Sequence, residues 1–232
     1  MTPGSRADHS CRSFRCLHHF RDGQFPALTI HVVLFDTLII FATLNTKLLP
    51  GITIDTWFFA LVSAVWLMLP AYVPNSAAAT IGGGRPIDGG RSWRDGRRVF
   101  GDGKTWRGLI GGVLAGVAVG GAGIWIQAFA GWPLPSHTPL TVWTFATGAL
   151  LGDLGKSFLK RRLGKAPGDP WPVADQYDLV IGAFLLTALL APSWLLSTIT
   201  LPILLWILVI TPILHRVTNI AGHRLGVKRV PW

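Results

Sequence analysis

The sequence predicts an all-α integral membrane protein with five transmembrane helices. Half of its 232 residues are apolar and only 14% are charged, whereas soluble domains carry roughly 25% charged residues. The mean hydropathy is positive, at +0.45. Apolar stretches of roughly 17 to 25 residues, the length that crosses about 30 Å of hydrocarbon as a helix, recur along the chain. No separate soluble domain fits in the length that remains.

Five stretches meet this criterion, and we predict spans at residues 56–73, 109–130, 140–158, 179–196 and 200–217. The second span opens directly after a polar, glycine-rich run, and the fourth follows two aspartates. The second span also carries Gly112, Gly116 and Gly120 at intervals of four residues, so three missing side chains share one helical face. Such a face predicts close helix packing, and a slot for a lipid is the alternative.

We separate an N-terminal extension at residues 1–50 from a membrane-embedded domain at residues 51–232. The arginines of the extension, followed by the apolar run 27–44, fit a signal peptide, a sixth helix or an upstream start site, and these alternatives stay open. Cys11 and Cys16 lie near two histidines, but their spacing is looser than that of a metal site. We expect free thiols there.

The net charge of +10 could indicate a nucleic-acid partner, but the basic residues are placed as in a membrane protein. They gather at residues 85–107, 156–165 and 216–229, whereas the connections at residues 131–139 and 191–199 carry no Lys, Arg, Asp or Glu. Basic loops of membrane proteins lie mainly on the cytoplasmic side. We therefore predict a multi-pass protein of the cytoplasmic membrane, with its basic segments inside and no nucleic-acid partner.

The run at residues 101–108 places a phosphate-binding kind of loop at the membrane surface. Glycine permits close approach of the backbone to a phosphate, and lysine and arginine pair with it. The loop residues expected at a substrate phosphate are Arg97, Arg98, Gly101, Asp102, Gly103, Lys104, Thr105 and Arg107. For Asp102, a turn residue, a partner of Lys104 and a metal contact are all compatible with the pattern.

A second polar region begins near the end of the third span. Its residues recur at intervals of three and four and therefore share one helical face: Asp153, Lys156, Ser157 and Lys160. Asp175 and Asp178 follow one turn apart, before the fourth span. Carboxylates of this kind hold Mg²⁺ when water and phosphate complete its coordination, and an Asp153–Lys156 ion pair is the alternative. With the basic loop, this region predicts phosphoryl or nucleotidyl transfer.

At this point the chain resembles the CDP-archaeol synthases, archaeal-type relatives of the CTP-dependent phosphatidate cytidylyltransferases. The likeness covers roughly residues 56–232. It is carried, in order, by residues 70–75, by Gly84 with residues 86–88, and by residues 94–98, 101–108, 152–162, 175–178 and 215–232. So many separated blocks in one order make coincidence a poor explanation.

The resemblance implies an enzyme that transfers a cytidylyl group from CTP to the phosphate of 2,3-bis-O-geranylgeranylglycerol phosphate and releases pyrophosphate, as a step of polar membrane lipid biosynthesis. The lipid phosphate is then the nucleophile, so the protein needs to hold two polyanions together and neutralise their charge. The implied cofactor is Mg²⁺, and the partners are CTP, an isoprenoid ether lipid phosphate and the bilayer. A homo-oligomer is compatible with the sequence.

Within this mechanism we assign roles to individual residues. The metal candidates are Asp153, Asp175 and Asp178, and catalytic roles fall to these three with Lys156 and Lys160. Substrate contacts outside the run at residues 97–107 are expected at Asn75, Asp88, Ser157 and Arg161. Asn75 could recognise the base or ribose, or cap the end of the first span. His215 and Asn219 face one way at the end of the fifth span, where a structural role is favoured over a catalytic one.

Two other functions remain compatible with the sequence. The first is a cytidylyltransferase for ester-linked phosphatidate, since the head-group chemistry is identical. The second is a transporter in which the intramembrane acids mark an ion path. The polar residues gather on one side of the membrane and not at its midplane, where transporter sites lie, and this favours the enzyme.

Overall fold

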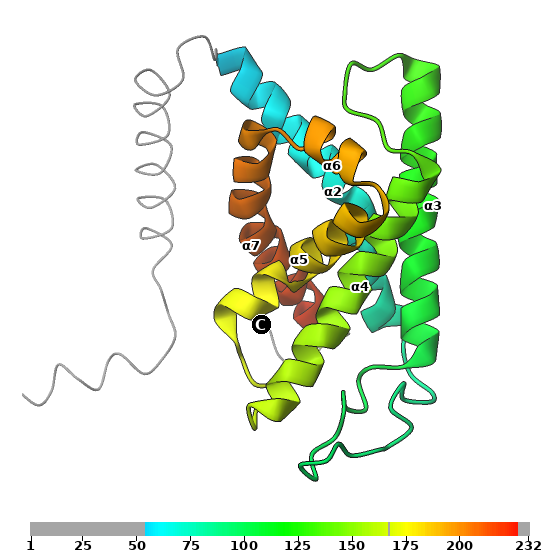
Figure 1. The fold of residues 1–232 in the computed structure, drawn as a ribbon, viewed down its shortest axis with the longest axis vertical. Coiled ribbons are helices and arrows are strands. Elements are labelled where there is room, and N and C mark those ends of the chain that lie inside the picture. The colour runs from blue at the N-terminus through cyan, green and yellow to red at the C-terminus, as the bar shows by residue number, and fades with distance from the viewer. Residues whose placement is uncertain (1–53, 167, 227–232) are drawn as a thin grey trace, which may run out of the picture. The chain divides into compact units, whose positions relative to one another are not determined.

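The structure is a computed structural model that describes residues 54–166 and 168–226 (Figure 1). This part of the chain is all-helical, as predicted, apart from two isolated bridges between α2 and α3. The helices are α2 (Ile54–Ile81), α3 (Trp106–Ala130), α4 (Pro139–Arg162), α5 (Pro172–Leu190), α6 (Pro192–Thr198) and α7 (Leu201–Arg224). The extension at residues 1–50, with its apolar run 27–44 and both cysteines, lies outside the described residues.

Among the described helices, α2, α3, α5 and α7 are long and apolar enough to cross a membrane. α4 is 24 residues long, and its last turn carries three basic side chains. The predicted spans 56–73, 109–130 and 140–158 each lie inside one helix, and the span 200–217 lies inside α7 apart from its cap residue Thr200. The sequence therefore predicted the positions of these four helices correctly.

The fourth predicted span, residues 179–196, is wrong at its C-terminal end. The structure has two helices there, because α5 ends at Leu190 and α6 begins at Pro192. Ala191 between them has φ −145° and ψ 54°, which agrees with the bias of a residue before proline away from the helical region. α5 also begins earlier than predicted, at Pro172, so Asp175 and Asp178 lie within its first two turns.

α2 and α3 pack through prolines on one helix and glycines on the other. α2 continues through Pro70 and Pro74 to Ile81, so Asn75 lies inside a helix and does not cap its end. A Cβ atom at Gly116 would lie 2.5 Å from Pro74 Cγ and 2.7 Å from the Pro70 carbonyl oxygen. The glycine face of α3 therefore packs closely against α2, as predicted, and its glycines are the buried residues of this helix.

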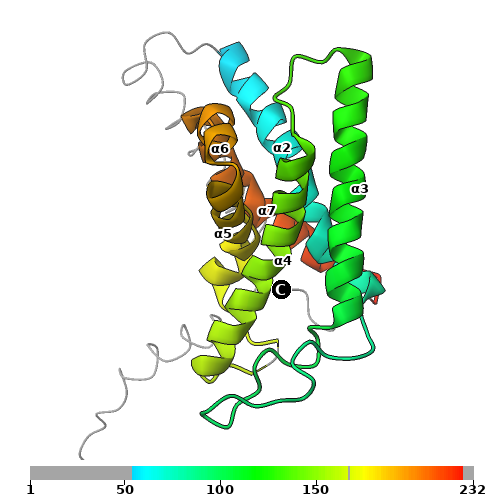
Figure 2. The same cartoon turned by 45° about the vertical axis from the view of Figure 1, so that its right-hand side comes forward.

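α4 and α5 cross at a second set of glycines, and both views show the two helices side by side (Figures 1 and 2). A Cβ atom at Gly152 would lie 2.0 Å from the carbonyl oxygen of Asp178, and one at Gly182 would lie 2.1 Å from that of Gly148. No side chain fits between the backbones at this crossing. Asp153 and Asp178 are therefore brought together by main-chain contact.

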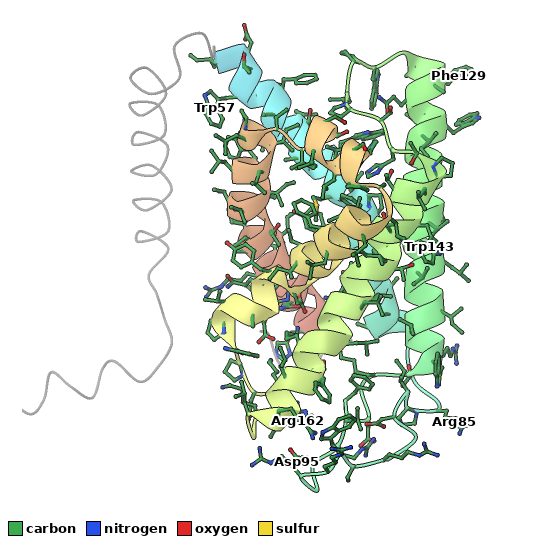
Figure 3. The ribbon with its side chains drawn as sticks, in the orientation of Figure 1. Trp57, Arg85, Asp95, Phe129, Trp143 and Arg162 are labelled. Atoms are coloured by element: carbon green, nitrogen blue, oxygen red, sulfur yellow. The ribbon has the colours of Figure 1, made fainter. Side chains whose placement is uncertain are left out.

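A buried core joins α2, α4, α5 and α7, with Leu67, Met68, Phe145 and Ile207 among its fully buried side chains. Some polar groups inside it are paired, as in the 2.7 Å hydrogen bond between the Thr144 and Thr187 hydroxyls. Figure 3 shows Arg85, Asp95 and Arg162 at one end of the helices and Trp57 and Phe129 at the other. We call the first the polar end; it carries the loop at residues 82–105.

Candidate active site

The loop at residues 82–105 is organised around one buried carboxylate, Asp88. It accepts hydrogen bonds from the backbone N–H groups of Gly90, Phe100 and Gly101, at 3.1, 3.0 and 3.0 Å, and forms an ion pair with Arg98 at 2.8 Å. Gly101 adopts φ +108°, which favours glycine. Burial alone would raise the pKa of Asp88, but the hydrogen bonds outweigh it and hold that pKa well below its usual range.

The middle of this loop is fastened to the C-terminal end of α4 by two arginines. Arg97 Nη1 donates to the carbonyl oxygen of Arg162 at 2.8 Å. In return, Arg162 pairs with Asp95 at 2.5 Å and donates to the carbonyl of Arg98 at 2.6 Å. A cation at a helix C-terminus satisfies carbonyl groups and complements the helix dipole. Arg97 therefore holds the loop in place.

The end of the loop delivers Lys104 to the carboxylates of α4. Thr105 is the N-cap of α3, and its hydroxyl accepts the N–H of Gly108 at 3.1 Å. This cap fixes where the loop stops and the helix begins. Lys104, the preceding residue, forms an ion pair with Asp153.

Three carboxylates from two helices converge on one ammonium group. The distances from Lys156 Nζ to carboxylate oxygens are 3.2 Å (Asp153), 3.2 Å (Asp175) and 2.5 Å (Asp178). Lys160 Nζ reaches Asp175 at 2.6 Å. With Lys104, the cluster holds three lysines and three aspartates, and its formal charge is zero. Every one of these side chains is less than 30% exposed, so the pairing replaces lost hydration.

A cleft of about 250 Å³ opens between this cluster, the loop and the end of α7. The cluster residues Asp153, Lys156, Lys160 and Asp175 line it together with Lys104. The opposite wall is formed by α2 and α7, with Asn75, His215 and Asn219. Cationic groups, hydrogen-bonding groups and carboxylates thus face one space, which is suited to a phosphate-bearing ligand.

The carboxylates fit a divalent cation in their chemistry, although no three His, Cys, Asp or Glu side chains in the described part of the chain are arranged as metal ligands. Oxygen donors of this type suit Mg²⁺. The carboxylate of Asp178 is buried; its Oδ1 accepts the N–H of Leu179 at 2.7 Å, and its Oδ2 is paired with Lys156. In the structure, the position among the three carboxylates is occupied by the ammonium group of Lys156.

The structure divides the predicted site residues into groups. The cleft brings together Asn75, Gly103, Lys104, Thr105, Asp153, Lys156, Lys160 and Asp175, with Asp178 attached through Lys156. A separate cavity is lined by Arg97, Arg98, Gly101, Asp102 and Arg161. The other three line neither space. Asp88 forms the centre of the loop, and the Ser157 hydroxyl donates to the carbonyl of Asp153 at 2.8 Å. Arg107 is exposed on α3.

Some cleft residues were not predicted as site residues. His215 and Asn219 line the cleft, and Asn219 Nδ2 lies 3.3 Å from His215 Nδ1. Their spacing of four residues indicated a shared face, but it could not indicate that this face turns toward the carboxylates. Asp169 also lines the cleft, and its carbonyl accepts a hydrogen bond from Lys160 at 2.8 Å. No pattern in the sequence signals that contact.

Comparisons with known proteins identify the family of the chain. The family model "CarS-like: CDP-archaeol synthase" matches residues 58–232. A CDP-archaeol synthase of Methanoculleus marisnigri is 64% identical over 166 residues, which cover 71% of this chain and all of the relative. One of Methanoregula boonei is 59% identical over 165 residues, with the same coverage.

A solved structure described as an intramembrane enzyme for archaeal membrane lipid biosynthesis is 38% identical; the match covers 62% of this chain and 90% of that one, with a TM-score of 0.49. The family model spans the loop, the carboxylate cluster and the end of α7, which are the parts that form the cleft. The chain therefore belongs to the CarS-like family of CDP-archaeol synthases.

Proposed function

We propose that this protein transfers the cytidylyl group of CTP to the phosphate of 2,3-bis-O-geranylgeranylglycerol phosphate, with release of pyrophosphate. The observation that carries the proposal is the meeting of Lys104 and the carboxylate–lysine cluster in one cleft at the polar end. Family membership supports the reaction class. No nucleophilic side chain is required, because an oxygen of the lipid phosphate attacks the α-phosphorus and the bond to the pyrophosphate oxygen breaks.

In this reaction the lysines change partners when the nucleotide arrives. Lys104, Lys156 and Lys160 are neutralised by aspartates in the structure, and they are the groups that can turn to triphosphate or lipid phosphate oxygens. Such contacts orient the two phosphates and offset their repulsion. Asn75 on the opposite wall is placed to bind the nucleotide or the lipid head group.

The carboxylates Asp153, Asp175 and Asp178 would hold Mg²⁺ on the cluster side of the cleft. The chemistry that Mg²⁺ supplies when bound is charge neutralisation on phosphate oxygens and activation of the α-phosphorus. The residues themselves keep the site dry, since the side chain of Asp153 is only 8% exposed and that of Asp178 only 2% exposed. Both lie beside the glycine crossing of α4 and α5, which limits how far they can separate.

We also propose that five helices, α2, α3, α4, α5 and α7, span the cytoplasmic membrane with the polar end in the cytoplasm. Single cysteines at Ser92, in the loop, and at Ser136, before α4, test this orientation in a Cys11→Ser, Cys16→Ser background. Both serines are exposed. A membrane-impermeant thiol reagent should label them from opposite faces of sealed vesicles. Labelling of both from one face would contradict the orientation.

The reaction itself is tested with purified protein in detergent. The protein is given CTP, Mg²⁺ and a panel of ether- and ester-linked lipid phosphates, and products are identified by mass spectrometry. We expect a CDP-lipid from the isoprenoid ether phosphate, pyrophosphate in equal amount, and no product after EDTA. Asp55→Asn, on the exposed first turn of α2, is the matched control for Asp153→Asn. Absence of any CDP-lipid from active preparations would contradict the proposal, and a product from the ester lipid alone would change the substrate.

A further inference from the structure

A second cavity lies at the polar end and is distinct from the cleft. Its volume is about 290 Å³, and it is lined by Arg97, Arg98, Gly101, Asp102, Arg161, Gly164 and Lys165. None of these residues lines the cleft that holds Lys104 and Asp153. The two spaces are therefore lined by different residues.

The charge of this cavity differs from that of the cleft. It is lined by four cationic side chains and one carboxylate. That carboxylate, Asp102, has a side chain that is 82% exposed and is paired with Arg98 at 2.7 Å. In the cleft, by contrast, three lysines are matched by three aspartates. Asp88 also pairs with Arg98, at 2.8 Å, and four cations still face only two carboxylates. An excess of cations in a cavity attracts an anion.

The cations are held in place before any ligand arrives. Arg97 Nη1 is bound to the carbonyl of Arg162 at 2.8 Å. Gly164, with φ +76°, lies directly beneath the Arg97 guanidinium, where a Cβ atom would be 3.2 Å from Nη1. Arg161 is only 8% exposed, and its Nε is buried without a hydrogen-bond partner. A buried guanidinium N–H without an acceptor is costly, and a phosphate oxygen would satisfy it.

The surroundings indicate where the anion comes from. Leu159 on the last turn of α4 is 52% exposed, Leu163 at its C-cap is 62% exposed, and Trp93 in the loop is 49% exposed. Trp93 packs edge-on against Phe158, with ring centroids 5.4 Å apart. Exposed leucine and tryptophan beside arginine and lysine are typical of the membrane–water interface. Basic pockets at this level bind lipid head groups.

We propose that this cavity binds the phosphate of an anionic membrane lipid that is not the substrate. The lipid phosphate lies among Arg97, Arg161 and Lys165, and its chains lie along the exposed leucines of α4. Bound there, it joins the loop to the end of α4 and so stabilises the segment that carries Lys104. The inference concerns binding only and does not depend on the reaction proposed above.

The test measures lipid binding by the intact protein in a neutral detergent. Phosphatidylglycerol is the anionic probe and phosphatidylcholine the zwitterionic control, with bound lipid counted by native mass spectrometry and stability followed by thermal unfolding. We expect phosphatidylglycerol to bind and raise the unfolding temperature, and phosphatidylcholine to do neither. Lys165→Gln should weaken phosphatidylglycerol binding about fivefold, the contribution of one cation near a lipid surface.

Matched variants separate this site from general electrostatics. Arg94→Gln removes an exposed cation from the same loop outside the cavity, and it should leave the affinity for phosphatidylglycerol within about twofold of wild type, because an exposed charge is screened. Arg161→Gln should weaken binding more than Lys165→Gln. If Arg161→Gln fails to fold, Lys165→Gln with its control still decides the matter.

Three results would overturn the proposal. Equal affinity of wild type and Lys165→Gln for phosphatidylglycerol would show that the lipid does not bind in this cavity. If millimolar phosphate or pyrophosphate raises the unfolding temperature of the wild type but not of Lys165→Gln, and phosphatidylglycerol raises neither, the cavity binds a free anion. If CTP raises the unfolding temperature of the wild type but not of Lys165→Gln, while both bind phosphatidylglycerol equally, the cavity binds the nucleotide. Failure of CTP turnover leaves all three readouts unchanged, so the two proposals fail separately.

Discussion

The two ends of α4 use polar residues for different purposes. At its N-terminal end, Thr138 and Thr141 form a reciprocal capping box. His137 is bound to the carbonyl of Leu67 at 2.9 Å and stacked on Trp194 at 5.0 Å. All of these polar groups find their hydrogen-bond partners within the protein. Burial lowers the pKa of His137 to about 4, so its side chain is neutral at pH 7. At the C-terminal end, Asp153 and its neighbours are charged and paired with residues of other elements.

This difference indicates which polar residues serve architecture and which serve chemistry. Neutral hydrogen bonds fix the start of a helix at little cost. Buried ion pairs are poor stabilisers, because the loss of hydration offsets their attraction, and groups with strongly altered environments concentrate at functional sites. Substitutions at the two ends should therefore affect different properties, turnover at one and stability at the other.

The largest effect is expected from the carboxylates. Asp153→Asn or Asp175→Asn should lower turnover by more than about a hundredfold, because charge neutralisation at the phosphates supplies several kcal/mol in reactions of this class. Circular dichroism should show a folded protein. Asp55→Asn, at the opposite end of the bundle, should turn over normally. Near-normal CTP turnover in either cluster variant would show that these carboxylates are not the site.

The next effect separates two cations of the predicted loop. Lys104→Ala should lower kcat/KM for CTP by about one to two decades, the cost of a charge-assisted hydrogen bond of roughly 1.5 to 3 kcal/mol. Arg107 is exposed and does not line the cleft, so Arg107→Ala should cost less. Lys104→Arg should restore part of the loss. If all three variants match wild type in steady-state kinetics, the loop is only a linker.

Two glycines provide a sharper contrast within the polar end. A Cβ atom at Gly103 would meet nothing within 4 Å, whereas one at Gly152 would lie 2.0 Å from the Asp178 carbonyl oxygen. Gly103→Val should therefore weaken CTP use about tenfold without lowering the unfolding temperature, because it fills space that a ligand needs. Gly152→Ala should lower stability by about 1 to 3 kcal/mol. An unstable Gly103→Val protein would refute the assignment of open space.

The smallest effect belongs to the neutral end of α4. The pKa of His137 is lowered to about 4 in the folded protein, below the ordinary value of about 6.5. The unfolded chain therefore binds the proton first, and stability is full above pH 6.5 and falls as the pH drops toward 4. The expected loss at pH 5 is up to about 2 kcal/mol. His137→Gln should flatten this profile and leave turnover at pH 7 unchanged; equal pH profiles would contradict the assignment.

The sequence located the helices better than it located their limits. Apolar length predicts the helices because the thickness of the hydrocarbon core sets it, and the uneven distribution of Lys and Arg marks the connections between them. The end of α2 was missed because proline usually breaks a helix, whereas Pro70 and Pro74 lie against glycines of α3 and the helix continues past Asn75. The break at Ala191 was missed because the surrounding residues remain apolar.

The site was predictable by residue type but not by arrangement. The aspartates and lysines of α4 share a face because of helical spacing, and that spacing is visible in the sequence. Which loop cations reach them depends on turns set by Asp88 and Gly101, and no spacing rule describes those turns. Lys104 was therefore predicted together with Arg97, although one enters the cleft and the other holds the end of α4.

The glycine crossing of α4 and α5 has a consequence for how the protein can move. Gly152 and Gly182 leave no layer of side chains between the two backbones, so neither helix can slide or rotate without a main-chain clash. The distance between Asp153 on α4 and the two aspartates on α5 is therefore fixed by the contact between the two backbones. A motion that changes the width of the cleft would therefore have to come from the loop, which is joined to α4 by the Lys104–Asp153 ion pair, by the hydrogen bonds of Arg97 and Arg162, and by the packing of Trp93 on Phe158. Of the three lysines in the cluster, Lys104 alone belongs to the loop, so its ion pair with Asp153 is the one that a movement of the loop would break.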